Sequence, residues 1–141
     1  MKTRKKKTER QKAVESLDKI FSEFIRRRKA VMDIATCVTC GIAKPWKEMQ
    51  CGHYISRGKF GTRWDEKNCH VQCYACNVML HGNYPKYARY LIGTYGINIL
   101  DELELKGNST PRFSVGELLL MVDEYKRKVE LLTNGSIRAI V

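Results

Sequence analysis

Residues 37–77 of this 141-residue chain read CVTCGIAKPWKEMQCGHYISRGKFGTRWDEKNCHVQCYACN. A CxxC pair opens the stretch, a second pair closes it, and His53 lies between the two pairs. Because a CxxC turn presents two thiolates to one ion, two such turns can complete the tetrahedral, four-ligand site that structural zinc prefers. The sequence therefore predicts one zinc site with four cysteine ligands: Cys37, Cys40, Cys73 and Cys76.

The predicted zinc has a structural role, because four cysteines leave no open coordination position at which the ion could activate water. Zinc binding would then supply much of the folding free energy of residues 36–82. Four unrelated thiols in a reduced protein are the alternative interpretation. Cys51 and Cys69 lie outside the pairs and are interpreted as small buried apolar residues. Cys69 could instead replace a zinc ligand, and Cys51 could form a second partial site with His53.

The charge of the chain points to a polyanionic partner. Its 26 Lys and Arg residues outnumber 15 Asp and Glu residues, which gives a formal net charge of +11. Such an excess is typical of proteins that bind nucleic acid or an anionic membrane. Nucleic acid is favoured, since no apolar run approaches the roughly 18 residues that a membrane span needs. Six cysteines without an export signal indicate a reducing compartment, so we expect a cytoplasmic protein.

The chain divides into three expected segments. These are a basic arm with an amphipathic helix over residues 1–35, a zinc-bound core over 36–96 and a C-terminal helical segment over 97–141. Residues 2–12 carry seven basic side chains and one acidic side chain. This composition suits either an arm that follows DNA phosphates or a solvated terminus.

Helical periodicity marks both ends of the chain. Apolar residues recur at three- and four-residue steps from about Lys12 to Asp33, which predicts a helix. Ser114 and Glu117 form the capping box that opens the last predicted helix. The apolar stripe of that helix consists of Leu118, Val122, Tyr125, Val129 and Leu132. It is expected to pack on the chain's own core, and a dimer seam is the alternative.

Polar residues between and after the two cysteine pairs suit metal-assisted hydrolysis of a phosphodiester. That reaction needs a base to activate water and a cation to neutralise developing charge. His53 is a suitable base near neutral pH, and the side-chain oxygen of Asn77 is a suitable ligand for magnesium. His81 shares a face with Asn77 if both lie on one helix. It is then a second metal ligand or a phosphate contact, or else a surface histidine near a helix end.

A basic loop follows His53. Arg57, Lys59 and Arg63 lie on a stretch that also contains glycines. They are expected to grip phosphates beside the scissile bond, with a solvated loop as the alternative. His70 falls in a predicted strand, and we interpret it as structural.

Four short segments carry a resemblance to a known family: Gly52–Gly58, Arg63–Asn68, Gln72–Asn77 and Leu80–Asn83. They resemble the lambdoid phage NinG (Rap) family, HNH-like nucleases associated with recombination and branched DNA. The order of cysteine pair, histidine, cysteine pair and asparagine is also similar to that of endonuclease VII-type Holliday-junction resolvases. The resemblance covers about residues 36–96.

The resemblance implies an α+β fold, with a zinc-stabilised ββα-metal (HNH-like, treble-clef) core between N- and C-terminal helices. In such a core His53 would be the general base. Asn68 would brace the loop that orients the histidine, and Asn77 would be a ligand of the catalytic metal.

One position departs from the pattern of HNH nucleases. In many HNH and endonuclease VII-type sites an Asp immediately precedes the catalytic His and binds the metal, whereas this chain has Gly52 there. The missing ligand would come from Asp65 or Glu66, or His81 would substitute for it.

Together these features predict a magnesium- or manganese-dependent endonuclease that cuts Holliday junctions, D-loops or other branched DNA. By analogy it would act as a homodimer, and in the bacterial host cytoplasm if it is phage-encoded. One alternative is a zinc-stabilised protein that binds branched DNA without cutting it. Another is a zinc-held module that recruits a protein partner through its C-terminal stripe.

Overall fold

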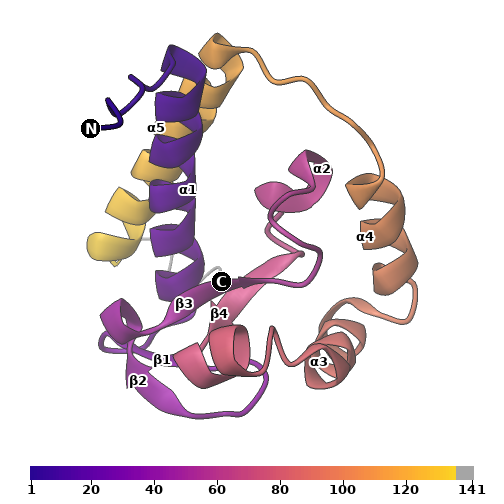
Figure 1. The fold of residues 1–141 in the computed structure, drawn as a ribbon. Helices are drawn as coiled ribbons and strands as arrows, with labels where there is room; N and C mark the ends of the chain where they lie inside the picture. Colours follow the sequence, from indigo (N-terminus) through magenta and orange to yellow (C-terminus); the bar gives the residue numbers. More distant parts are fainter. Residues whose placement is uncertain (136–141) are drawn as a thin grey trace.

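The computed structural model describes residues 1–135 and shows a mixed α+β fold (Figure 1), which confirms the expected fold class at that level. Its elements are α1 (Glu9–Arg27), β1 (Ile34–Thr36), β2 (Ala43–Pro45), η1 (Trp46–Glu48), β3 (Gln50–His53), α2 (Phe60–Arg63), β4 (Cys69–Gln72), η2 (Ala75–Met79), α3 (Tyr84–Tyr95), α4 (Ile99–Gly107) and α5 (Val115–Thr133). Of these, η1 is a 3₁₀-helix and η2 a π-helix. None of the described helices is both long and apolar enough to cross a membrane.

Helices α1 and α5 lie side by side although they come from opposite ends of the chain (Figure 1). Each begins with a capping box, at Thr8 and Gln11 for α1 and at Ser114 and Glu117 for α5. The apolar stripe of α5 is buried within the same cluster as that of α1. The stripe therefore packs on the chain's own core, as its spacing predicted.

Two antiparallel hairpins form the β structure of residues 1–135. β1 pairs with β2, and the loop between them carries the first cysteine pair. β3 pairs with β4 in a register that sets Gln50 opposite Gln72 and His53 opposite Cys69. Because Cys73 follows β4 directly, the β3–β4 hairpin places the second cysteine pair next to the first pair in the β1–β2 loop.

The segment after the second cysteine pair differs from the sequence-based expectation. The helix η2 ends at Met79, and His81 follows it with a left-handed φ of 50°. Asn77 and His81 consequently do not lie on one helix, and the shared face inferred from their spacing is wrong. The left-handed turn continues through Gly82 and Asn83 before α3 begins, with Pro85 in its first turn.

Helices α3 and α4 form a smaller apolar cluster beside the β3–β4 hairpin: Tyr87, Leu91, Ile99 and Leu103. The Tyr87 hydroxyl donates a hydrogen bond of 2.7 Å to the carbonyl oxygen of Gly52. His70 on β4 lies 3.1 Å from the Tyr87 hydroxyl and 2.9 Å from that of Tyr95. These contacts join α3 to the hairpin that carries His53.

Candidate metal centre and active-site cleft

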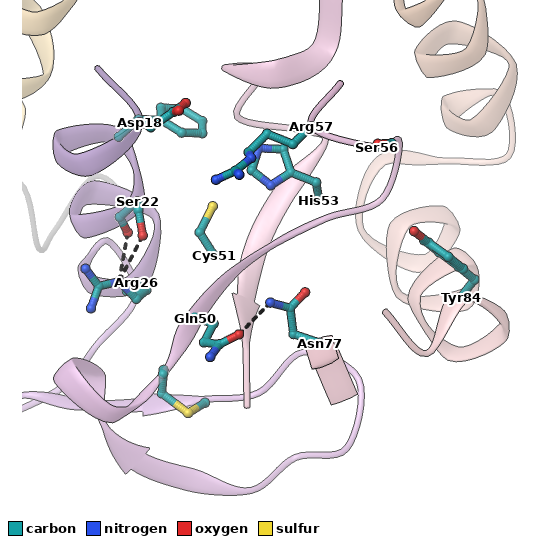
Figure 2. A pocket seen from close by; sticks show the side chains of 12 residues that line it. Asp18, Ser22, Arg26, Gln50, Cys51, His53, Ser56, Arg57, Asn77 and Tyr84 are labelled. Carbon is teal, nitrogen blue, oxygen red and sulfur yellow. Dashed lines mark hydrogen bonds between the residues drawn. The ribbon is translucent and has the colours of Figure 1, made fainter. Parts of the chain in front are cut away.

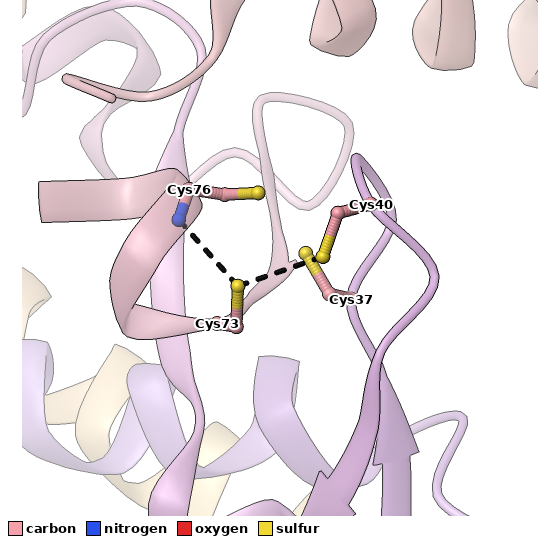
Figure 3. Close-up of side chains that lie close together, drawn as sticks. All are labelled: Cys37, Cys40, Cys73 and Cys76. Carbon is pink, nitrogen blue, oxygen red and sulfur yellow. Dashed lines mark hydrogen bonds between the residues drawn. The ribbon is translucent and has the colours of Figure 1, made fainter. Parts of the chain in front are cut away.

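The four cysteines of the two CxxC pairs meet at one point (Figure 3). Their sulfur atoms all lie within 4.8 Å of one another, and the Sγ atoms of Cys40 and Cys73 are 3.6 Å apart. Zn–S bonds of about 2.3 Å would place tetrahedral thiolates about 3.8 Å apart. The cluster can therefore hold one zinc ion with the four ligands that the sequence predicted.

The thiol of Cys37 has a lowered pKa. Burial opposes its ionisation, but hydrogen bonds from the Thr39 side chain and from backbone amides outweigh burial and lower the pKa of Cys37 to about 6. A thiolate is the form that binds metal. The lowered pKa therefore favours the form of Cys37 that can bind a metal ion.

A cleft of about 480 Å³ lies between α1 and the β3–β4 hairpin (Figure 2). β3 contributes Gln50, Cys51 and His53 to its lining, and η2 contributes Asn77. Helix α1 contributes polar residues at four-residue steps, which places them on one helical face: Asp18, Ser22 and Arg26. This contribution of α1 was not predicted from the sequence, although the four-residue spacing of polar side chains on an amphipathic helix was the available signal.

His53 is held in a defined orientation. Its Nε2 atom lies 2.8 Å from the carbonyl oxygen of Arg63, which can only accept a hydrogen bond. Nε2 therefore carries the proton in the neutral ring, and Nδ1 is left to accept one. Burial lowers the pKa of His53 below its ordinary value, and the charge of Arg57 acts in the same direction. The imidazole is consequently neutral at physiological pH.

The loop that separates His53 from Arg63 is fixed by Asn68, whose side chain is fully buried. Asn68 Oδ1 accepts a hydrogen bond of 2.8 Å from the amide of Ile55. Its Nδ2 donates to the carbonyl oxygens of Ile55, at 3.0 Å, and of Thr62, at 3.1 Å. One amide group therefore ties the start of the loop to its end, next to the carbonyl that orients His53.

Asn77 lines the same cleft as His53, and its orientation is set by Gln50. Asn77 Nδ2 donates a hydrogen bond of 2.7 Å to Gln50 Oε1 (Figure 2). With the nitrogen committed to Gln50, the oxygen Oδ1 is the atom that Asn77 can offer to a cation. Gln50 is another residue of the cleft that was not predicted from the sequence.

The glycine at position 52 is explained by packing. A Cβ atom at Gly52 would lie 1.9 Å from Oε1 of Gln72. The Gln72 side chain is fully buried and donates to Thr39 Oγ1 and to the carbonyl oxygen of Gly82. An Asp at position 52 would therefore displace a side chain that connects β4 to the first cysteine loop and to the turn after η2.

The other predicted metal ligands do not reach this cleft. Asp65 pairs with Lys106 on α4, and Glu66 bonds to Tyr125 and Lys128 on α5. His81 is exposed, and none of Asp65, Glu66 and His81 is among the described residues that line the cleft. The carboxylate that does line it is Asp18.

Comparison with known proteins places the chain in a family. The family model described as "Bacteriophage Lambda NinG protein" matches residues 1–135. The chain belongs to the NinG family.

Curated NinG relatives come from phages. The chain is 29% identical to "Protein ninG" of Escherichia phage 933W over 123 residues, which cover 86% of this chain and 59% of the relative. It is 28% identical to "Protein ninG" of Escherichia phage lambda and of Salmonella phage P22, over 86% of this chain and 58% of each relative. The chain thus spans less than two thirds of the length of these NinG proteins. No solved structure matches it.

The basic residues of this NinG-family chain occupy different positions around the site. Arg57 lines the His53 cleft and also a second cleft of about 980 Å³. The second cleft is lined by further cations, several from the N-terminal arm: Lys5, Lys6, Lys7, Arg10, Lys19 and Arg63. Lys59 is exposed and lines neither cleft within residues 1–135. Of the three predicted phosphate contacts, Arg57 is the one that joins the two clefts.

Arg63 is engaged by a carboxylate. Its Nε and Nη2 atoms donate to the two oxygens of Asp18 at 3.0 and 2.6 Å. The indole Nε1 of Trp64 donates to the same carboxylate at 3.0 Å. Asp18 on α1 therefore anchors the segment whose main-chain carbonyl orients His53.

Proposed function

We propose that this NinG-family chain is a divalent-metal-dependent endonuclease of branched DNA, with an HNH-like ββα-metal core. The observation that carries the proposal is the setting of His53. Its Nε2–H is held by the Arg63 carbonyl, and its ring lies in a cleft with the Asn77 amide and the Arg57 guanidinium. This arrangement supplies a base, a cation ligand and a positive charge within one cleft.

The order of elements supports the ββα-metal assignment. β3, β4 and η2 occur in this order, with the short helix α2 between the two strands. His53 is the last residue of β3, and Asn77 lies on η2. The four-cysteine cluster joins the start of η2 to the β1–β2 loop, so zinc would fix the position of Asn77 relative to the hairpin. Zinc in this role is structural and takes no part in the reaction.

In the proposed reaction, Nδ1 of His53 accepts a proton from a water molecule. The oxygen of that water forms a bond to phosphorus, and the bond from phosphorus to the departing sugar oxygen breaks. Arg57 and Arg26, which both line the cleft, hold the phosphate by charge. The leaving oxygen takes a proton from solvent, and His53 returns its own proton to solvent.

The donor set of the cleft fits a hard divalent cation. Magnesium takes oxygen ligands, needs only one or two from the protein and retains several waters. Asn77 Oδ1 is the protein oxygen that the geometry leaves for this purpose. When bound, magnesium or manganese would neutralise charge on the phosphate and on the departing oxygen.

The preference for branched DNA comes from the family resemblance and is supported by the charge distribution. The His53 cleft and the second, lysine-rich cleft share Asp18 and Arg57, so two DNA segments could be held side by side. Two strands must be cut to resolve a junction, which favours a homodimer with two such sites. A phage-encoded enzyme of this kind would act in the host cytoplasm.

The test compares a labelled four-way junction with a linear duplex of the same arm sequence, each incubated with magnesium, manganese or a chelator. We expect metal-dependent nicks near the branch, which are lost in His53→Ala and retained in His81→Ala. His81→Ala is the matched control, because it removes an exposed imidazole outside the cleft. Equal cleavage by His53→Ala would contradict the assignment of the base.

One observation favours a second candidate function, binding of branched DNA without cleavage. The carboxylate that lines the cleft, Asp18, is already engaged by Arg63 and Trp64, and Gly52 offers none. Under this alternative the wild-type chain and His53→Ala bind a junction equally, and neither cuts it with magnesium or manganese.

A further inference from the structure

We propose that Cys51, His53 and Cys69 form a second metal site, for a thiophilic ion such as zinc, in addition to the four-cysteine cluster. The two thiol sulfurs and an imidazole nitrogen all lie within 4.8 Å of one another. This is the same limit within which the sulfurs of the four-cysteine cluster lie.

The register of the β3–β4 hairpin explains why these three side chains meet. Cys51 and His53 are two residues apart on β3, so their side chains leave the same face of the strand. His53 stands directly opposite Cys69 on β4. The three ligands are therefore presented by paired strands, whose backbone positions are fixed by hydrogen bonds, and their meeting does not depend on a loop.

The chemistry of the three groups selects a soft or borderline ion. Two thiolates and one imidazole suit zinc, whereas magnesium prefers oxygen ligands. Three protein ligands leave a fourth coordination position open. Cys51 and His53 line the His53 cleft, so this position would be reached from the cleft, which also supplies the path of entry.

The surroundings suit a site that carries two thiolates. Arg26 lines the cleft beside Cys51, and Arg28 donates a hydrogen bond of 2.8 Å to the carbonyl oxygen of Cys69. Both cations offset the negative charge that two thiolates would bring. The Arg63 carbonyl lies 2.8 Å from Nε2 of His53 and 3.6 Å from Sγ of Cys69, so one backbone group already positions two of the ligands.

Occupancy of this site would switch off the proposed reaction. An ion bound at Nδ1 takes the lone pair that the base uses, and an ion bound at Nε2 breaks the hydrogen bond to Arg63. Zinc in excess of one equivalent would therefore inhibit cleavage that magnesium supports. This consequence rests on the proposed function, whereas the existence of the site does not.

The experiment counts zinc on the whole chain, kept reduced with a phosphine that does not bind metal. The protein is equilibrated with zinc, free metal is removed, and the ratio of zinc to protein is measured by elemental mass spectrometry. We expect two equivalents in the wild type, one in Cys51→Ala and one in Cys51→Ala/Cys69→Ala. His81→Ala is the control and should retain two. Circular dichroism verifies that each variant is folded, and Cys51→Ala is the gentlest change because Cys51 is only half-buried.

A single equivalent in the wild type, or two in Cys51→Ala, would overturn the second site. Cleavage assays separate this outcome from failure of the proposed function. Two equivalents in the zinc count, with no cleavage in magnesium or manganese by protein loaded with a single equivalent of zinc, would support the site and reject the nuclease. Cleavage with a single equivalent would support the nuclease and reject the site.

Discussion

The helical pair α1–α5 and the cysteine-rich region from β1 to η2 are stabilised by different means. The core of the helical pair is built from large apolar side chains, among them Leu17, Phe21, Ile25, Leu118 and Tyr125. The buried cluster in the cysteine-rich region is Ala35, Cys37, Met49, Val71, Cys73 and Cys76. Half of its members are cysteines of the CxxC pairs, which can hold zinc. Hydrophobic burial holds the first region together, and we expect zinc to supply much of the stability of the second, because its apolar core is small.

The His53 cleft lies between these two regions and takes its lining from both. α1 supplies Asp18 and Arg26, whereas β3 and η2 supply His53 and Asn77. The cleft thus lies between a hydrophobic core on one side and a cluster that can hold zinc on the other. Changes to either region should therefore affect the cleft by separable routes.

Of the changes proposed here, loss of zinc should have the largest effect, and it should separate the two regions. Cys73→Ser removes one of four ligands, and structural zinc in small domains supplies about 10–16 kcal/mol of apparent binding free energy. We expect residues 36–82 to lose protection of their backbone amides against hydrogen exchange, while α1 and α5 keep more of theirs.

Amide exchange followed by NMR measures the two regions separately. The zinc content of the Cys73→Ser protein is measured in the same samples, to verify that the ion has been lost. Lys44→Ser is the control, because Lys44 is exposed on β2 and lies outside the four-cysteine cluster. A fully protected Cys73→Ser protein would show that zinc does not hold this region.

The matching change in the helical pair is Leu17→Ala. Leu17 is fully buried between α1 and α5, and truncation of a buried Leu costs about 2–5 kcal/mol. Urea denaturation should show this loss, with the four-cysteine cluster still binding one zinc ion. Leu120→Ala provides the control, because Leu120 is 70% exposed on α5 and should change stability by less than about 0.5 kcal/mol. Equal effects of the two substitutions would mean that α1–α5 packing does not carry the stability of this region.

Parts of this organisation follow from local sequence, and other parts do not. The cysteine set and the capping box at Ser114 depend on short spacings, and both were predicted from them. The common helix for Asn77 and His81 was wrong, because η2 is a single π-helical segment that a left-handed turn follows. Residue spacing alone does not predict the last residue of such a short helix.

The lining of the cleft shows the same limit at longer range. Asp65 was a candidate ligand on sequence grounds, but in the structure its carboxylate forms an ion pair with Lys106 of α4. Asp18 was not considered, because only the packing of α1 on the hairpin brings it beside His53. A side chain at position 52 would meet Gln72, and that contact joins residues on two strands. Each of these facts depends on tertiary contacts that one sequence does not contain.

Acid should lower the free energy of unfolding through His70, which joins the β3–β4 hairpin to α3. Burial, with smaller contributions from Arg28 and Lys29, lowers the pKa of His70 from 6.5 to about 3. The unfolded chain takes up this proton as pH falls below 6.5, whereas the folded chain does not, so stability is lost between pH 6.5 and pH 3. The loss should reach about 2 kcal/mol at about pH 5 relative to about pH 8.

His70→Gln isolates this effect, because an amide can still bond to the Tyr87 and Tyr95 hydroxyls without titrating. Free energies of unfolding of both proteins at these two pH values give the difference due to His70. Other acid effects, including protonation of zinc ligands, are common to the two proteins. The same pH dependence in both would remove His70 as its cause.

The smallest predicted effect concerns the surface where the two clefts meet. Arg57 and Lys59 are exposed, lie two residues apart and carry the same charge, but only Arg57 lines the clefts within the described residues. If DNA occupies them, Arg57→Gln should weaken junction binding and reduce the slope of log affinity against log salt by about 1. Lys59→Gln should leave the slope closer to that of the wild type, and neither change should alter stability. Equal slopes for the two variants would mean that the basic loop acts through its overall charge, and that the clefts do not define the path of the DNA.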